Sequence, residues 1–232
     1  MSAEKNGSLK TARTTVRRLP ERGHYDREEI YGVLDAGFIC HVGFCVEDQP
    51  YVVPTSYWRK EDHVYFHGSA ASRMLRTVAG EIPVCLTATH VDGLVLARSG
   101  FHHSINYRSV MILGNAALVS DDKEKFAAFQ DFVDYVLPGR WPEIRWPDEQ
   151  EMKATSVLRL PIEEASVKIR KGDPKDDAAD LEMNVWAGVI PLYTVAGDPI
   201  SAKDLRTGVA EPAYARNYRA RGVSKAAIGS RQ

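Results

Sequence analysis

Apolar and polar residues alternate over much of the chain, which is the pattern of strands with one buried face. The clearest alternation spans residues 38–46, where Phe38, Cys40 and Val42 fall on one side and Ile39 and His41 on the other. The same pattern and the turn residues between its repeats predict further strands at residues 51–58, 63–67, 83–91, 94–98, 107–119, 157–160, 166–170 and 186–192. The connections are short, and we interpret Asp92-Gly93 as a hairpin turn, so the sheet is expected to be antiparallel.

Three segments follow a helical period instead. They lie at residues 26–37, 69–79 and 121–137, and we expect Asp26 and Ser120 to cap the first and the last of them. The longest helix is expected to bury a stripe made of Phe126, Phe129, Val133 and Val136.

Six or more antiparallel strands with a few short helices and no βαβ alternation predict a mainly β fold, an antiparallel six-stranded β-barrel that is closed or half-closed. The sequence has neither a G-x-G-x-x-G nor a G-x-x-x-x-G-K-[ST] motif, which argues against the common dinucleotide and nucleotide loops. We divide the chain into a flexible N-terminal tail at residues 1–20, a barrel domain at residues 21–195 and a C-terminal extension at residues 196–232.

Composition narrows the class of protein. The chain has 232 residues, 26% of them charged, and a formal net charge of −1, so it has no bulk attraction for nucleic acid or for a membrane surface. No apolar run is long enough to span a bilayer, and the polar N-terminus does not resemble a signal peptide. Three cysteines without C-x-x-C spacing are typical of reduced core thiols, so we expect a cytoplasmic protein.

The segment 65–74 carries the most chemistry. A strand ends at Gly68-Ser69 and leads into a short helix that carries Ser72 and Arg73. Free N–H groups at a helix start, small residues and an arginine form an arrangement that binds phosphate, although both serines also qualify as simple caps. His67, at the end of the strand, either contacts the ligand or donates a proton beside it, or is a buried histidine bonded to a carbonyl.

Other candidates have weaker signals. His102 and His103 are adjacent, but neighbouring side chains of extended chain point in different directions and no further ligand spacing accompanies them, so we expect no metal site. Pro54 and Thr55 lie in a predicted strand, where proline favours an edge that a flat ring can approach. Trp186 is by default a core or interface aromatic residue.

Several pieces together resemble the flavin-binding split barrels of the pyridoxamine 5′-phosphate oxidase superfamily, and most closely its NimA-like branch, which is named for nitroimidazole resistance. The pieces occur in the expected order and are Val33-Leu34-Asp35-Ala36-Gly37-Phe38, Gln49-Pro50-Tyr51-Val52-Val53-Pro54-Thr55, Tyr65-Phe66-His67-Gly68-Ser69, Asn106-Tyr107-Arg108-Ser109-Val110 and Trp186-Ala187-Gly188-Val189-Ile190-Pro191.

The resemblance implies a homodimer with two FMN sites at the subunit interface. It places the flavin phosphate at His67, Gly68, Ser69, Ser72 and Arg73. It places the isoalloxazine ring beside Val53, Pro54 and Thr55, with Ser109 at the border of the flavin and Trp186 reaching in from the other subunit.

Two departures from the oxidase itself bear on the substrate. Met74 stands where the oxidase has a lysine directly after the arginine of its S-R-K segment, and the C-terminal arginine motif that binds the oxidase's substrate is not evident near Trp186. Oxidation of vitamin B6 is therefore not expected, and the His67-Gly68 pair agrees with the NimA-like branch.

The function that follows is an FMN-dependent oxidoreductase in which a nicotinamide donor reduces a small electron-poor acceptor, such as a nitro compound or a quinone. His67 is the candidate for proton delivery. Two alternatives remain open from the sequence: a flavin-binding or sensing protein without turnover, and a split barrel that binds haem or the deazaflavin F420.

Overall fold

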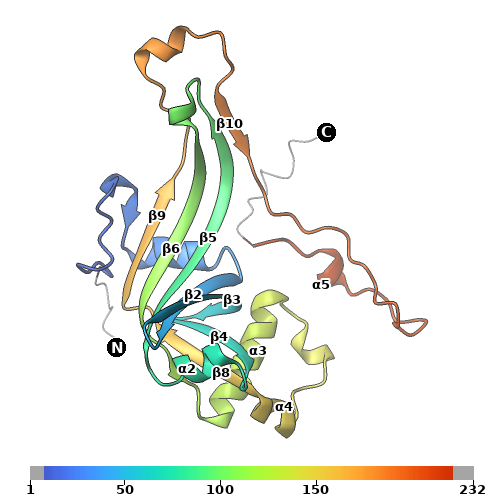
Figure 1. Ribbon diagram of the computed structural model, residues 1–232. Helices are drawn as coiled ribbons and strands as arrows, with labels where there is room; N and C mark the ends of the chain where they lie inside the picture. Colours follow the sequence, from blue (N-terminus) through green and yellow to red (C-terminus); the bar gives the residue numbers. More distant parts are fainter. Residues whose placement is uncertain (1–7, 222–232) are drawn as a thin grey trace, which may run out of the picture.

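One continuous antiparallel sheet organises the chain. The computed structural model describes residues 8–221 (Figure 1), and within them no helix has the length and apolar character needed to cross a membrane. The strands are β1 (Gly23–His24), β2 (Ile39–Val46), β3 (Gln49–Lys60), β4 (His63–Ser69), β5 (Pro83–Leu96), β6 (Ser104–Asn115), β7 (Ala117–Leu118), β8 (Thr155–Pro161), β9 (Glu164–Arg170) and β10 (Gly188–Pro191). The helices are α1 (Arg27–Leu34), α2 (Arg73–Val78), α3 (Asp122–Val136), α4 (Glu149–Ala154) and α5 (Ala213–Arg216), with 3-10 turns at Pro20–Arg22, Gly100–His102, Trp141–Glu143 and Ala178–Glu182.

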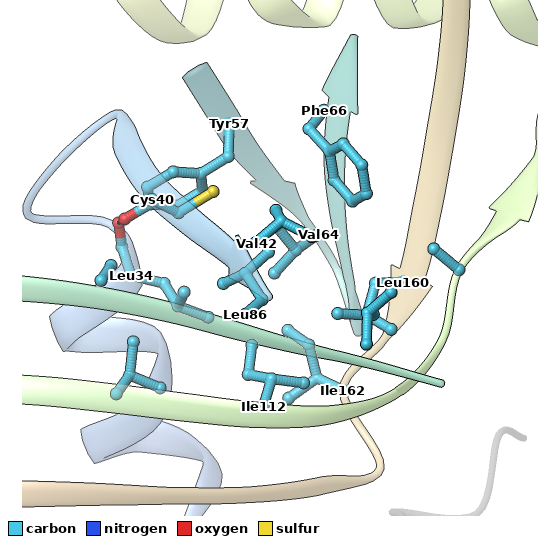
Figure 2. Close-up of a cluster of buried hydrophobic side chains, with 14 of the residues drawn as sticks. Leu34, Cys40, Val42, Tyr57, Val64, Phe66, Leu86, Ile112, Leu160 and Ile162 are labelled. Atoms are coloured by element: carbon cyan, nitrogen blue, oxygen red, sulfur yellow. Dashed lines mark hydrogen bonds between the residues drawn. The ribbon is translucent and has the colours of Figure 1, made fainter. Parts of the chain in front are cut away.

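The strands pair in the order β1-β9-β6-β5-β2-β3-β4-β8-β7, and β10 adds to β5. The sheet curls so that its inner face encloses the apolar core. Figure 2 shows this core, where Val42, Val64 and Leu86 from three strands meet Ile112 and Leu160 from two others. All five side chains are fully buried. The predicted split barrel, mainly β with short helices, is thus the fold of the chain.

A second apolar cluster lies on the outer face of the sheet, under α3. Trp58 of β3 and Tyr65 of β4 stack with their ring centroids 5.6 Å apart, and α3 covers them with Phe129, Phe132 and Tyr135. The predicted stripe of α3 is only partly correct. Phe129 packs on this cluster as expected, but Phe126 turns to the two tryptophans that follow the helix, and Ala128, which the stripe left out, is the buried residue of α3. Aromatic residues occur on two faces of this helix, so periodicity alone does not select the face.

The Asp92-Gly93 hairpin predicted from the sequence is wrong. β5 continues through both residues with a register irregularity between Val91 and Gly93, and the chain reverses at residues 97–103 instead. Glycine is needed here because β10 passes close by, and a Cβ on Gly93 would lie 3.0 Å from the carbonyl oxygen of Ile190. The result is a long hairpin that projects beyond the barrel (Figure 1). We call residues 91–107 together with β10 the arm.

The two ends of the described chain behave differently. Residues 8–20, which the sequence predicts as part of a flexible tail, are attached to the sheet, because the backbone of Leu9 bonds Tyr25 and Ala165 and because Arg13 pairs with Glu164. Residues 1–7 lie outside the described residues. After β10, residues 192–221 run as an extended segment away from the arm and return to the barrel near α3 (Figure 1). We call them the tail.

Candidate functional site

The predicted phosphate-binding residues lie where β3 and β4 diverge. β3 pairs with β4 only over Tyr57–Lys60, whereas residues 49–56 of β3 pair with β2 alone and residues 67–69 of β4 pair with β8 alone. Between the two free edges the sheet is open. We call this opening the fork, defined by residues 49–56 and 67–69.

Each predicted residue of the fork has a definite side. Strand alternation turns Val53 and Thr55 toward the barrel core and Pro54 toward the outer face, where Pro54 and Ser69 are exposed and His67 is half-buried. The N–H and C=O groups on the fork side of residues 49–56 have no strand partner among the described residues. An exposed strand edge with proline, as predicted for Pro54, is therefore present.

Arg73 stands at the mouth of the fork. It is the first residue of α2, its guanidinium lies 4.9 Å from the centroid of the Tyr51 ring, and Nη1 donates to the Tyr51 hydroxyl at 3.3 Å. Tyr51 in turn stacks on Phe44. No carboxylate of the described residues forms an ion pair with Arg73, so its charge is available to an anion.

α2 begins at Arg73 rather than at Ser69, so that Ser72, one of the two possible caps, occupies its N-cap position, and its side chain makes no cap hydrogen bond. Ser69 behaves differently, since its hydroxyl accepts from the backbone N–H of Ala71 and stabilises the turn. Gly68 packs closely on Leu75 of α2, because a Cβ at Gly68 would lie 3.1 Å from Cδ1 of Leu75. The small residues therefore shape the turn, and Ser72 and Arg73 carry the free polar groups.

His67 has an unusual environment. Its ring packs between Phe132, with the centroids 4.5 Å apart, and Trp58, with the centroids 5.7 Å apart. Nδ1 is buried and has no hydrogen-bond partner among the described residues, and neither has Nε1 of Trp58. Burial lowers the pKa of His67, so the ring is neutral at neutral pH. It is not the carbonyl-bonded histidine that the sequence left as an alternative.

Ser109 and Trp186 do not meet the fork within one protomer. Ser109 lies on the outer face of β6, where its hydroxyl hydrogen-bonds that of Thr89 at 2.9 Å. β5 and β2 separate Ser109 from Pro54 on β3, a distance of about 14 Å at the usual strand spacing. Trp186 precedes β10 at the far end of the arm and is 64% exposed.

Sequence reasoning missed three neighbours of the site. His41 lies opposite Pro54 in the β2–β3 register, and its outward position was visible in the strand alternation. Tyr51 contacts Arg73, and Phe132 contacts His67. No local signal identifies these two, because each contact joins elements that are distant in sequence.

The histidines of the arm have local partners. Nδ1 of His103 bonds the carbonyl oxygen of Ser99, and Nε2 of His102 lies 3.2 Å from the carboxylate of Asp177. Asp180 lies close to this pair, so the three side chains form a small polar cluster at the tip of the arm. The sequence predicts no metal site at these histidines, and the two carboxylates of the cluster lie more than seventy positions away from them along the chain.

Comparison with known proteins agrees with the family resemblance and with the split-barrel fold. The family model for pyridoxamine 5′-phosphate oxidase matches residues 26–169. No curated protein matches the chain. Among solved structures, the flavocytochrome Anf3 from Azotobacter vinelandii is 40% identical, with a TM-score of 0.84 over 88% of this chain and 95% of that one.

Two further structures are similar. The FAD and heme binding protein from Mycobacterium smegmatis is 32% identical, with a TM-score of 0.82 over 86% of this chain and 98% of that one. A putative 5-nitroimidazole antibiotic resistance protein from Bacteroides thetaiotaomicron is 21% identical, with a TM-score of 0.50 over 63% of this chain and 86% of that one. At that identity the last similarity shows the fold alone.

Proposed function

The chain belongs to the pyridoxamine 5′-phosphate oxidase family, and from that premise we propose that it is a homodimeric oxidoreductase that binds a flavin at the fork and a haem at His67. Two similar proteins support the pair of cofactors: one is a flavocytochrome, and the other is described as binding FAD and heme. FMN and FAD share the phosphate next to the ribityl chain, so the same residues serve either flavin.

The observation that carries the flavin site is the unpaired cation at the fork. Arg73 is held over Tyr51 without a carboxylate partner, next to the free hydroxyl of Ser72 and the open backbone edge of β3. A phosphate needs charged and neutral donors, and a flat polar ring needs a row of backbone donors and acceptors. The fork offers both within a few residues.

The haem site depends on the ring of His67. Of the seven histidines, all within the described residues, it is the only one with a buried ring nitrogen that lacks a hydrogen-bond partner. A neutral imidazole among aromatic side chains is the kind of group that would hold a haem iron here. We propose this role in place of the proton delivery expected from the sequence, because burial lowers the pKa of His67 and disfavours the protonated ring.

The proposed dimer is supported by two features of one protomer, an incomplete flavin environment and an exposed apolar face. Ser109 and Trp186 lie away from the fork of their own chain, and the outer face of β2 and β3 beside the fork is exposed, with Val52 at 68% and Ile39 at 50%. A second copy packed on this face covers it and brings the two residues toward the other fork.

The reaction we propose is the two-electron reduction of a small electron-poor acceptor, such as a quinone. A nicotinamide donor gives a hydride, the solvent gives a proton, and the quinone becomes a hydroquinone. The bound flavin and haem supply the electron-carrying chemistry. The protein's part is to hold the flavin phosphate at Arg73, to present the β3 edge to the ring and to keep His67 neutral and dry.

The visible spectrum of the purified protein tests the proposal. We expect the two bands of oxidised flavin and the Soret band of haem, and release of the cofactors will show whether the flavin is FMN or FAD. Arg73→Met should lower flavin occupancy at least tenfold, whereas Arg76→Met, which removes an exposed arginine from the same helix, should not.

A second pair of variants tests the haem. His67→Ala should abolish the Soret band, and His63→Ala, which changes a histidine on the same face of β4, should leave it unchanged. A colourless protein that gains no thermal stability from added flavin contradicts the proposed function.

A further inference from the structure

A cavity of about 470 Å³ lies at the base of the arm, away from the fork. The loop before β2 forms one wall through residues 36–38, and β5 and β6 form the floor. The tail closes the other side with residues 192–194 and 220–221. This volume lies within the range of small-molecule sites. We call it the arm-base cavity.

Of the charged side chains that line the cavity, two pair with each other and one cation has no carboxylate partner among the described residues. Arg108 donates two hydrogen bonds to the carboxylate of Asp92, at 2.9 and 2.8 Å, so these two charges balance. Arg221 donates only to backbone carbonyls, those of Asp35 and Tyr135, and stacks 3.6 Å from the centroid of the Tyr135 ring.

The carboxylate of Asp35, whose backbone carbonyl Arg221 contacts, does not neutralise Arg221, because it binds the guanidinium of Arg59 with both of its oxygens. Of the charged side chains that line the cavity, in the part of the chain that the structure describes, Arg221 is the one without a carboxylate partner. The lining therefore has a net positive charge and favours an anion.

The remaining lining is flat and mostly apolar. Phe38 contributes from the loop before β2, and Tyr193 contributes from the tail. His90 lies between them in the sheet, and its Nε2 donates to the carbonyl oxygen of Val33 at 2.9 Å. Since a carbonyl oxygen only accepts, Nδ1 of His90 is the acceptor of the ring. Aromatic surfaces around a cation select a planar ligand.

The cavity adjoins a residue of the expected flavin environment. Thr89 lines it, and the hydroxyl of Thr89 hydrogen-bonds Ser109, which the family resemblance places at the border of the flavin. A ligand held here lies next to the outer face of the sheet, where the second copy and its flavin are proposed to pack.

From the unbalanced Arg221, the aromatic lining and the Thr89–Ser109 contact, we infer that the arm-base cavity binds the electron acceptor, and that this acceptor is a planar aromatic anion. An aromatic carboxylate or sulfonate that carries a nitro or quinone group has this chemistry. The inference rests on the proposed function for the identity of the ligand as an acceptor, whereas the anion site itself depends only on the cavity.

The test is a calorimetric titration of the oxidised protein, with its cofactors as isolated and without electron donor. The probes are para-nitrobenzoate and its uncharged counterpart para-nitrobenzyl alcohol. We expect Arg221→Met to weaken binding of the carboxylate at least tenfold and to change binding of the alcohol less than threefold. Arg206→Met, which removes an exposed arginine of the same tail, should change neither.

Arg221→Lys separates charge from structure. Lysine keeps the cation but not the stacking on Tyr135, so we expect binding of para-nitrobenzoate within threefold of the unchanged protein. Equal loss in the Lys and Met variants, or equal binding of the two probes by the unchanged protein, overturns the inference. A protein without flavin that still binds the carboxylate through Arg221 refutes the proposed function and leaves the anion site standing. A flavin-containing protein that does not bind the carboxylate refutes the anion site and leaves the proposed function standing.

Discussion

The barrel and the tail are built in opposite ways from similar residues. In the barrel, Leu86 and Ile112 are fully buried among side chains from several strands (Figure 2). In the tail, every residue from 192 to 210 is exposed, and the apolar residues are no exception, with Ile200 at 95%. The inner face of the barrel therefore buries its apolar residues within one protomer, whereas the tail can bury its apolar residues only against another surface. An apolar residue on the inner face contributes to folding, and an apolar residue of the tail indicates a contact, as Ile39 and Val52 do on the outer face of the barrel.

The largest expected effect is a loss of stability from cutting into the barrel core. Leu86→Ala removes a fully buried side chain and leaves a cavity, so it should lower the free energy of unfolding by about 2–5 kcal/mol. Ile200→Ala in the tail is the matched change and should alter it by less than about 0.5 kcal/mol. Urea denaturation measures both. Similar losses from the two variants mean that the tail is part of the protomer's own core.

The next effect concerns two glycines. A Cβ on Gly37 would lie 2.5 Å from Cε1 of His90, so Gly37→Ala should cost about 1–3 kcal/mol and displace His90 in the arm-base cavity. Gly197 in the tail has no atom within 4 Å of the same position, so Gly197→Ala should leave stability unchanged or raise it by about 0.5 kcal/mol. Thermal unfolding measures the stability of the two variants. If Gly37→Ala does not lower the melting temperature, His90 moves freely.

Much of the barrel was predictable because its signals are local. Alternation located β2, β3, β4, β8 and β9 to within a few residues, and the cap of α1 is the predicted one, with Asp26 accepting from the backbone N–H of Glu29. The Gly68-Ser69 turn and the short helix after it also follow from residues next to one another, although α2 begins at Arg73, four residues later than expected. These features need only short-range geometry, which a single sequence carries.

The arm was not predictable from its own residues. Asp-Gly is the signal of a tight hairpin and equally a place where a strand can bulge. What decides between them is β10, whose carbonyl at Ile190 lies against Gly93 although the two residues are almost a hundred positions apart. The same limit applies to His67, whose partner Phe132 comes from a helix with aromatic residues on two faces.

A smaller effect follows from the neutral histidine of the barrel. Because burial lowers the pKa of His67, the unfolded chain binds more protons than the folded one as the pH falls through the ordinary histidine range near 6.5. His67 therefore leaves the free energy of unfolding unchanged above that pH range and lowers it below that range. In protein stripped of cofactor, His67→Phe should reduce the loss of melting temperature between pH 7.5 and 5.5.

The control for that measurement is His103→Phe in the arm, because His103 is exposed. We expect this variant to show the same pH dependence as the unchanged protein. If both variants behave alike, the protonation of His67 does not limit the stability of the barrel in acid.

The smallest effect on stability is expected from a charge in the tail, and the same variant tests what the tail contacts. Ile200→Asp exchanges a 95% exposed side chain for a charged one, so the free energy of unfolding of the protomer should stay within about 0.5 kcal/mol. If the tail packs on a second copy, the same change buries a charge in an apolar contact and should raise the dimer dissociation constant at least tenfold. Ser201→Asp adds the same charge one position along, where no apolar side chain is lost, and should weaken the dimer less.

Sedimentation over a range of concentrations measures the dissociation constant of the dimer for both variants. A dimer as strong with Ile200→Asp as without it means that the tail faces solvent in the dimer as well, and the exposed apolar residues of the tail then require a different partner.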